Sequence, residues 1–374
     1  LRVPMTNITL TFHGGGSGQE PPHLYGLAHI TAKMLFRGTP AMTREEISKK
    51  FELLGAAIEA HDSETDFFIL ISCFTKNLDR VLPLLAGTLD TATLPQHELA
   101  VLKKQVLNGL EAALLDPEEV LSAAHEYVLF GMDSLGKLGS RQAIGRITRE
   151  DIKKFYENVR ATQVLYLTAI SDLPKEKLEK QVSLLIHNRP TNGFTLKPEA
   201  RYHNASGYEA IIVNSSEATN DRLMWSHRGI EATDERRFDL SLVIDALGSF
   251  EGFLFDQLRN KNGWCYGAYA FAMQATTRPG RIAYYADPTS ETSTMLIPEM
   301  LRLLHLFPDE KDFQERFAER NTTFKNRYAY QLDLKKKLSN EINRDRYGIP
   351  ILDKEQYYQR IDAVTLSTAK KTIG

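Results

Sequence analysis

The sequence has only two cysteines among its 374 residues, Cys73 and Cys265, and they lie far apart in the chain. This spacing excludes a disulfide framework and a C-x-x-C site. It fits a reducing compartment, and equally a periplasmic protein without disulfides. No apolar run approaches the roughly 20 residues that a helix needs to cross a bilayer. The chain begins at Leu1 rather than Met, so we expect any signal peptide to have been removed or never present.

An excess of one charge is also lacking. The 46 Lys and Arg residues nearly balance the 48 Asp and Glu residues, giving a formal net charge of −2. No strong field therefore favours nucleic acid or an anionic membrane. The notable basic run, Lys335-Lys336-Lys337, lies in a helical stretch and is interpreted as a solvated helix face. The remaining composition, 42% hydrophobic and 25% charged, is typical of a soluble globular protein.

The first half of the chain combines strand patterns with a run of helices. Residues 7–12 alternate polar and apolar side chains, as a strand does. Thr43 is a predicted helix N-cap, with Glu46 three residues later completing a capping box. Further predicted elements are a helix over 25–36, a strand pair over 57–61 and 66–74, helices over 78–89, 98–115, 118–130 and 148–159, and a strand over 164–170.

The second half repeats this order. Predicted strands cover 209–213 and 223–227, helices 236–247 and 250–258, a second strand pair 266–273 and 281–287, and helices 292–306 and 309–346. The polar stretch over 191–204 is the predicted linker between a domain over 1–190 and a domain over 205–374. Strands followed by a run of helices in each half indicate an α+β fold with antiparallel-rich sheets covered by helices. A doubly wound sheet would instead alternate strands and helices regularly.

One helical segment has the frame of a known metal-binding motif. Residues His29-Ile30-Thr31-Ala32-Lys33 follow Gly26-Leu27-Ala28 and continue to Gly38-Thr39. This frame resembles the zinc-site helix of the pitrilysin (insulinase) metallopeptidases, whose box reads H-x-x-E-H. In that box two histidines four residues apart bind zinc, and the glutamate activates water. The resemblance matches His29 to the first histidine, Ala32 to the glutamate and Lys33 to the second histidine.

The chemical groups of the box are therefore missing. Ala32 cannot accept a proton, and the Lys33 ammonium has no lone pair and would repel a divalent cation. The family's third ligand, a glutamate, falls at Gly109; nearby Glu111 could restore one group at most. We therefore expect no zinc and no other cofactor in this chain. Without the resemblance, a lone His29 on an apolar helix is interpreted as a core histidine.

A second segment, Leu258–Gly267, resembles the L-R-x-x-x-G-x-x-Y segment of the family's second domain. The resemblance implies that its arginine and tyrosine, here Arg259 and Tyr266, hold the substrate backbone and stabilise the developing oxyanion. Donors aimed at a developing negative charge lower a reaction barrier. From the residues alone, Arg259 could instead interact with the last carbonyls of its helix, and Tyr266 could be a core residue that opens a strand.

The resemblance extends over nearly the whole chain and implies two homologous domains of LuxS/metallohydrolase-like fold. The loss of the zinc box beside retained Arg259 and Tyr266 resembles the non-catalytic partner in bacterial heterodimers related to the mitochondrial processing peptidase. We expect a non-catalytic subunit that closes the chamber and binds unfolded peptide for a zinc-bearing homologous subunit. Zinc is then expected in that partner. We expect a soluble bacterial protein, in the periplasm or the cytoplasm.

The sequence is also compatible with other classes of function. A structural scaffold is one alternative, and a peptide-binding or chaperone-like protein without a protease role is another, since open sheet edges can bind extended peptides. The run His13-Gly14-Gly15-Gly16 is similar to the oxyanion loop of lipases and esterases. That function also needs a G-x-S-x-G elbow, which the sequence lacks. These glycines are therefore predicted to form a turn between the first strand and the helix.

Overall fold

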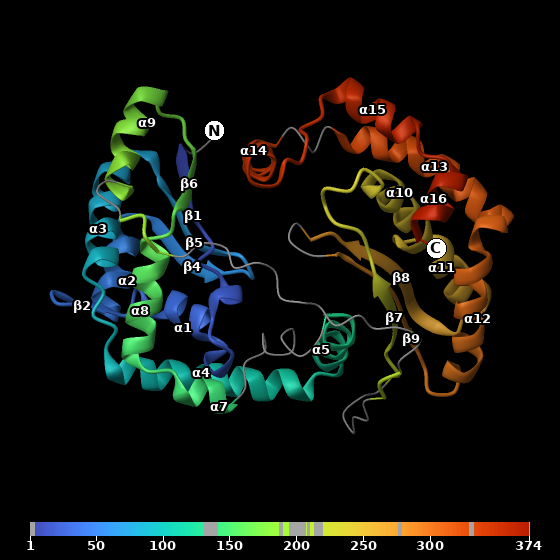
Figure 1. Cartoon of the computed structure of the whole chain (residues 1–374), viewed down its shortest axis with the longest axis horizontal. Coiled ribbons are helices and arrows are strands. Elements are labelled where there is room, and N and C mark those ends of the chain that lie inside the picture. The colour runs from blue at the N-terminus through green and yellow to red at the C-terminus, as the bar shows by residue number, and fades with distance from the viewer. Residues whose placement is uncertain are drawn as a thin grey trace. The chain divides into compact units, whose positions relative to one another are not determined.

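The computed structural model describes residues 4–130, 141–186, 190–193, 207, 210–212, 220–275, 279–328 and 333–373. The chain divides into two compact units, whose elements are labelled in Figure 1. Unit 1 comprises Leu1–Leu114 and Phe130–Ala200, and unit 2 comprises Leu115–Leu129 and Arg201–Gly374. The sequence boundaries placed residues 115–129 in the first domain, whereas their contacts place them in unit 2. Most of the expected linker over 191–204 lies outside the described residues.

Unit 1 is built on an antiparallel sheet in the order β4-β5-β1-β6. Central β1 places Leu10 opposite Ile69 of β5 and Leu167 of β6. Its alternating pattern explains this position, because Ile8, Leu10 and Phe12 share the buried face. The elements of unit 1 are β1 (Met5–His13), α1 (Leu27–Met34), β2 (Gly38–Thr39), β3 (Met42–Thr43), α2 (Arg44–Leu53), β4 (Ala56–Asp62), β5 (Asp66–Phe74), α3 (Leu78–Asp90), α4 (Gln96–Leu115), α7 (Arg141–Arg146), α8 (Arg149–Arg160), β6 (Val164–Ile170) and α9 (Lys175–Val182).

Helix and turn signals in the sequence explain the local structure of unit 1. The capping box predicted at Thr43 is confirmed, because its hydroxyl accepts the Glu46 N–H and its own N–H binds the Glu46 carboxylate. The glycine run after β1 forms the predicted turn, in which the Gly14 N–H donates to the Thr65 carbonyl at 2.9 Å. A Cβ at Gly16 would overlap the Ser63 carbonyl oxygen. Glycine is thus required at position 16 because the backbone approaches that of Ser63 too closely for a Cβ.

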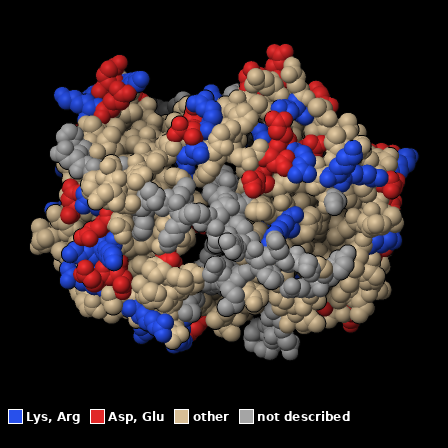
Figure 2. All heavy atoms as spheres, in the orientation of Figure 1, with Lys and Arg blue, Asp and Glu red and all other residues tan. Residues whose placement is uncertain are grey.

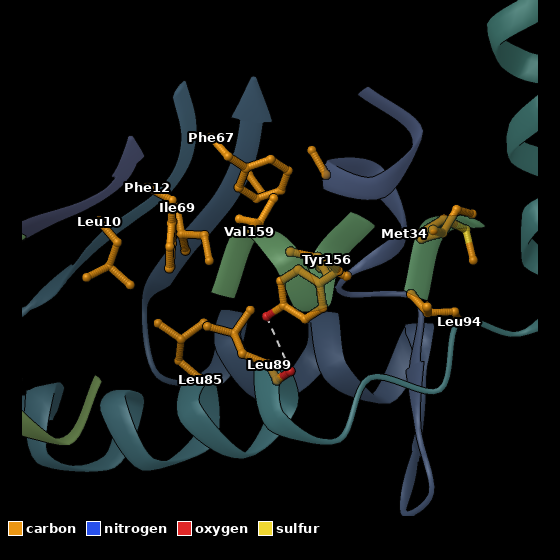
Figure 3. Packing of buried hydrophobic residues seen from close by; sticks show 14 of the residues in the cluster. Leu10, Phe12, Met34, Phe67, Ile69, Leu85, Leu89, Leu94, Tyr156 and Val159 are labelled. Atoms are coloured by element: carbon orange, nitrogen blue, oxygen red, sulfur yellow. Dashed lines mark hydrogen bonds between the residues drawn. The ribbon is translucent and has the colours of Figure 1, made fainter. Parts of the chain in front are cut away.

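The core of unit 1 lies between its sheet and the helices that cover it (Figure 3). Phe12 and Phe67 pack edge to face, with ring centroids 6.4 Å apart. Val159 of α8 lies beside Phe67 in the same view. The Tyr156 hydroxyl enters this core and donates to the Leu89 carbonyl at 3.3 Å. Burial raises the pKa of Tyr156, so the phenol remains a neutral donor that satisfies a buried carbonyl.

A buried carboxylate defines the start of α1. The Oε atoms of Glu20 accept the N–H of Gly26 at 3.0 Å and that of Ala28 at 2.5 Å. They satisfy donors that a helix N-terminus leaves unpaired. Burial nevertheless raises the pKa of Glu20 to about 7, against the opposing effect of these two hydrogen bonds. Gly26 precedes the helix with a φ of 95°, a conformation that favours glycine.

Unit 2 has an antiparallel sheet in the order β7-β9-β8. Three strands of unit 1, β4-β5-β1, have an equivalent order. In both units the second strand of a hairpin, β5 or β9, lies between the first strand of that hairpin and a strand earlier in the sequence. The elements of unit 2 are α5 (Pro117–Phe130, except its last residue), β7 (Leu223–Arg228), α10 (Arg237–Gly248), α11 (Phe253–Phe255), a π-helical turn (Asp256–Lys261), β8 (Cys265–Met273), β9 (Arg281–Pro288), α12 (Ser293–Leu306), α13 (Lys311–Arg327), α14 (Leu334–Tyr347), α15 (Lys354–Asp362) and α16 (Leu366–Ile373).

The α+β class with antiparallel sheets covered by helices is confirmed. The strand expected over 209–213 does not form in residues 210–212, the part of it that is described. The apolar pair Ile211-Ile212 had suggested a strand, but Ile212 is 92% exposed and is not buried in a core. No helix within the described residues combines the length and apolar character needed to cross a bilayer. On the face drawn in Figure 2, basic and acidic side chains are interspersed.

Helix α5 packs on the sheet of unit 2 through polar contacts. His125 Nδ1 hydrogen-bonds Ser226 Oγ, and the Arg228 guanidinium donates to the Leu129 carbonyl. Arg281 Nη1 lies 3.1 Å from Glu126 Oε1. Burial and then the Arg281 charge lower the pKa of His125 to about 4, so His125 is neutral in this contact at neutral pH. These bonds explain why residues 115–129 belong to unit 2.

The opposite face of this sheet approaches α10 closely at a glycine. A Cβ at Gly248 would overlap the backbone nitrogen of Ala270 on β8. We expect Gly248→Ala to lower the free energy of unfolding by about 1–3 kcal/mol or more, because neither backbone can move without repacking the core. The matched control is Gly87→Ala on α3, where a Cβ meets nothing within 4 Å and stability should rise by up to about 1 kcal/mol. Urea unfolding monitored by circular dichroism measures both; equal effects would contradict the assignment.

The raised pKa of Glu20 predicts a pH-dependent stability. The folded state holds the Glu20 proton up to about pH 7, whereas the unfolded chain releases it near the ordinary glutamate pKa of 4.5. The stabilisation of the folded state by the proton on Glu20 is therefore complete below pH 4.5 and is lost as pH rises to 7. The wild type should lose about 2–3 kcal/mol relative to Glu20→Gln between pH 5 and pH 8. Urea titrations at several pH values measure this, with exposed Glu150→Gln as control; a constant difference would refute it.

Candidate functional site

Helix α1 presents at the surface two of the residues that resemble a zinc box. The side chains of His29 and Lys33, one helical turn apart, are 49% and 40% exposed. Each has an acidic neighbour on β4: His29 Nδ1 lies 3.8 Å from Asp62 Oδ1, and Lys33 Nζ lies 3.9 Å from Glu59 Oε1. The interpretation of His29 as a core histidine is therefore wrong. Its helix is apolar on the opposite face, and His29 occupies the solvent side.

The remaining positions of the box cannot supply metal ligands. Ala32 is 1% exposed and packs in the core of unit 1. Gly109 lies on exposed α4, where a Cβ would meet nothing within 4 Å. Glu111 forms an ion pair with Arg141. Within the described part of the chain, no three His, Cys, Asp or Glu side chains gather as a metal site requires. This donor set does not fit a catalytic zinc ion.

In unit 2 the structure brings Arg259 and Tyr266 together. Arg259 belongs to the π-helical turn over Asp256–Lys261, and Tyr266 lies near the start of β8. The chain reverses between them at Gly263, which has a φ of 69°. An irregularity in the pairing of β8 with β9 lies between Cys265 and Ala268. π-Helical turns and strand bulges commonly redirect side chains at functional sites.

The Arg259 guanidinium lies over the Tyr266 ring, with Cζ 4.7 Å from the centroid. Its Nη1 also donates to the Tyr266 carbonyl, so the two residues are connected twice. Tyr266 is 72% exposed, which contradicts its interpretation as a core residue. Arg259 binds a carbonyl beyond its helix rather than the last helix carbonyls. Within the described residues it has no ion-pair partner, so its charge is available to a ligand.

Two neighbouring groups complete the electrostatics of this pair. Cys265 is buried, and burial, followed by the charge of Asp287, raises the pKa of its thiol to about 12. The Arg259 charge opposes this shift. Cys265 is thus a neutral packing residue and not a nucleophile at neutral pH. The Asp287 carboxylate accepts the Gly267 N–H, which fixes the backbone directly after Tyr266.

The sequence did not reveal the ring contacts that extend from this pair. Arg259 Cζ lies 5.5 Å from the Phe255 centroid, Phe255 lies 6.2 Å from Tyr269, and Tyr269 lies 6.5 Å from Tyr285. The alternating aromatic residues of β8 could have indicated one face of the strand. Their meeting with Phe255 and with β9 depends on tertiary packing.

The expected site residues thus form two clusters. His29, Ala32 and Lys33 lie on α1 of unit 1, and Arg259 with Tyr266 lies in unit 2. Gly109 lies in unit 1, on α4. The residues of each cluster all belong to a single unit.

Comparison with known proteins identifies both halves of the chain. Residues 4–137 match the family "Insulinase (Peptidase family M16)" and residues 146–316 match "Peptidase M16 inactive domain". An uncharacterized zinc protease of Streptomyces coelicolor is 23% identical over 265 residues, which are 68% of this chain and 57% of that protein. The chain thus spans less than two thirds of the length of this relative.

Solved structures share the whole fold. The peptidase M16 inactive domain from Pseudomonas fluorescens superimposes with a TM-score of 0.83 at 20% identity, covering 100% of this chain and 89% of that one. A protease from Helicobacter pylori gives a TM-score of 0.85 at 16% identity, covering 100% and 91%. At such identities the likeness concerns the fold. With both halves matched by one family along residues 4–137 and 146–316, the chain belongs to the insulinase (M16) peptidase family.

Proposed function

We propose that this protein is the non-catalytic subunit of a heterodimeric zinc endopeptidase. It binds unfolded peptide through Arg259 and Tyr266, closes the chamber, and leaves metal chemistry to a zinc-bearing homologous subunit. The observation that carries the proposal is the contrast between the two clusters. The α1 cluster has an ammonium and a buried methyl group where a metal site needs donors. In the Arg259–Tyr266 pair the tyrosine is exposed and the arginine partly exposed, the guanidinium is held over the ring, and neither residue has an ion-pair partner in the described residues.

The chemistry of this pair supports a role in peptide binding. A guanidinium donates up to five hydrogen bonds and a phenol one, and carbonyl oxygens of an extended peptide accept such bonds. The Tyr266 ring holds the Arg259 plane, so less side-chain entropy is lost when a ligand binds. When a carbonyl develops negative charge, the same donors stabilise it more strongly than the ground state. The pair can therefore assist hydrolysis without carrying the metal.

Mixing the chain with a zinc-bearing homologue tests the proposal. We expect cleavage of a quenched fluorescent peptide only in the mixture. Arg259→Ala should lower kcat/KM by about 10²–10³-fold, because one donor to the developing charge is lost. Arg259→Lys should recover part of it, since the charge remains while the planar stacking is lost.

The matched control is Arg302→Ala on α12, an exposed arginine paired with Glu299 and Glu310. This variant should cleave at the wild-type rate. Full activity of the homologue alone, unaffected by adding this chain, would refute the subunit function and favour a scaffold.

The purified chain should also hold no stoichiometric zinc. His29 offers one nitrogen, and the adjacent Lys33 ammonium repels a divalent cation. Metal analysis after dialysis against zinc should give the same substoichiometric content for the wild type and for His29→Ala. Stoichiometric zinc that a chelator removes, and that His29→Ala abolishes, would contradict this prediction. The homologue with an intact box serves as the positive control.

A further inference from the structure

The Arg259 guanidinium is held on one side and has unused hydrogen-bond donors on the other. Its Nη1 donates to the Tyr266 carbonyl, whereas its Nε and Nη2 donate to no acceptor among the described residues. These two nitrogens point N–H groups from the same edge of the planar guanidinium. Such an edge matches the two oxygens of a carboxylate, which it binds through two parallel hydrogen bonds. A neutral carbonyl offers one oxygen and no charge.

Two aromatic rings keep this edge in a defined place. Arg259 Cζ lies 4.7 Å from the Tyr266 centroid and 5.5 Å from that of Phe255, which is only 7% exposed. Phe255 is the last residue of α11, which is next to β8 in unit 2 (Figure 1) and leads directly into the π-helical turn. Because both rings order the guanidinium before a ligand arrives, less side-chain entropy is lost on binding.

The acidic side chains of this region pair with other arginines. Asp256, three residues before Arg259 in the same turn, lies 3.3 Å from Arg316 Nη2. Asp287, on the strand that pairs with β8, lies 3.3 Å from Arg222 Nη1. In the part of the chain that the structure describes, no carboxylate therefore neutralises Arg259. A carboxylate from a ligand would supply the missing negative charge.

Peptide hydrolysis creates a carboxylate at the group that this pair contacts. In the proposed function, Arg259 and Tyr266 hold the scissile carbonyl. Hydrolysis adds water to the carbonyl carbon and breaks its bond to nitrogen. The water oxygen stays on the acyl carbon and both water protons go to the departing nitrogen, so the products are a carboxylate and an ammonium. The acyl product thus ends in a free carboxylate beside an arginine whose charge is not neutralised.

We propose that the Arg259–Tyr266 pair binds the free C-terminal carboxylate of a peptide and so retains the acyl product of cleavage. The inference rests on the proposed function and adds the regulation of the same site, which is inhibition by product. Arg259 Nε and Nη2 bind the two carboxylate oxygens, and the Tyr266 hydroxyl supplies a third donor. Peptides that end in a carboxylate are ligands of the isolated chain, whereas peptides that end in an amide bind more weakly.

Two peptides labelled with a fluorophore at the N-terminus test this, identical except that one ends in a carboxylate and the other in an amide. Fluorescence anisotropy with the full chain should show about fivefold tighter binding of the acid at low ionic strength. In about 1 M salt the two affinities should become nearly equal, because an exposed ion pair is screened. A preference that salt leaves unchanged would overturn the inference, and this wild-type measurement needs no variant to fold.

Variants assign the preference to the guanidinium. Arg259→Gln should lower it below about 1.5-fold, and Arg259→Lys should give an intermediate value, since the charge remains without the planar pair of donors. The control Arg302→Gln removes an exposed arginine that pairs with Glu299 and Glu310 on another face of unit 2 and should keep the full preference. A full preference in Arg259→Gln would refute the assignment.

A second pair of peptides separates two sources of a carboxylate. Both end in an amide, and one carries an internal glutamate where the other carries glutamine. Equal affinity for these two supports recognition of the C-terminus. A glutamate preference as large as the acid preference would overturn the inference, in favour of an acidic side chain as the ligand.

Inhibition of partner-dependent cleavage gives an independent measurement. In the mixture with a zinc-bearing homologue, the acyl product should inhibit about fivefold more strongly as the acid than as the amide. If cleavage requires Arg259 while acid and amide bind and inhibit alike, the product inference fails and the proposed function stands. If the mixture never cleaves peptide although the acid preference depends on Arg259, the proposed function fails while carboxylate binding stands.

Discussion

The antiparallel pairing of β8 with β9 is the constraint on which the site in unit 2 depends. It places Tyr269 opposite Tyr285 and Ala270 opposite Tyr284, so successive residues of β8 serve opposite faces. On one face, small Ala270 lets α10 approach at Gly248. On the other, the rings of Tyr269, Phe271 and Tyr285 face α5 across a groove. The irregularity after Cys265 interrupts this alternation and leaves Tyr266 at the surface, beneath the Arg259 guanidinium. Shifting the register by one residue would exchange the two faces.

In unit 1, helix α1 keeps its position without a cluster of metal-ligating side chains among the described residues. Glu20 still anchors the start of α1, and the apolar side of the helix still packs against the sheet. Ala32 belongs to that packing. His29 and Lys33 stay in solvent with Asp62 and Glu59 nearby, and such exposed ion pairs contribute little stability. The helix is therefore maintained by packing and capping, both independent of a metal.

Helix α5 comes from the first half of the sequence but packs on the sheet of unit 2. Asp116, Glu118 and Glu119 lie at its N-terminal end, and its later turns carry His125 and Glu126, which bind β7 and β9. The helix thus serves as one side of a groove whose other side comes from strands about a hundred residues later in sequence.

Local signals in the sequence determined much of this protein. Strand alternation, the cap at Thr43 and the glycine turn after His13 predicted the α+β elements, because each depends on neighbouring residues. The degenerate box was recognised through the resemblance to a zinc-site helix, and residue chemistry then excluded metal ligation by Ala32 and Lys33. The exposure of His29 and Tyr266, the docking of α5 and the row of rings could not be predicted this way. Those features depend on which faces meet across long sequence separations, and only tertiary packing decides that.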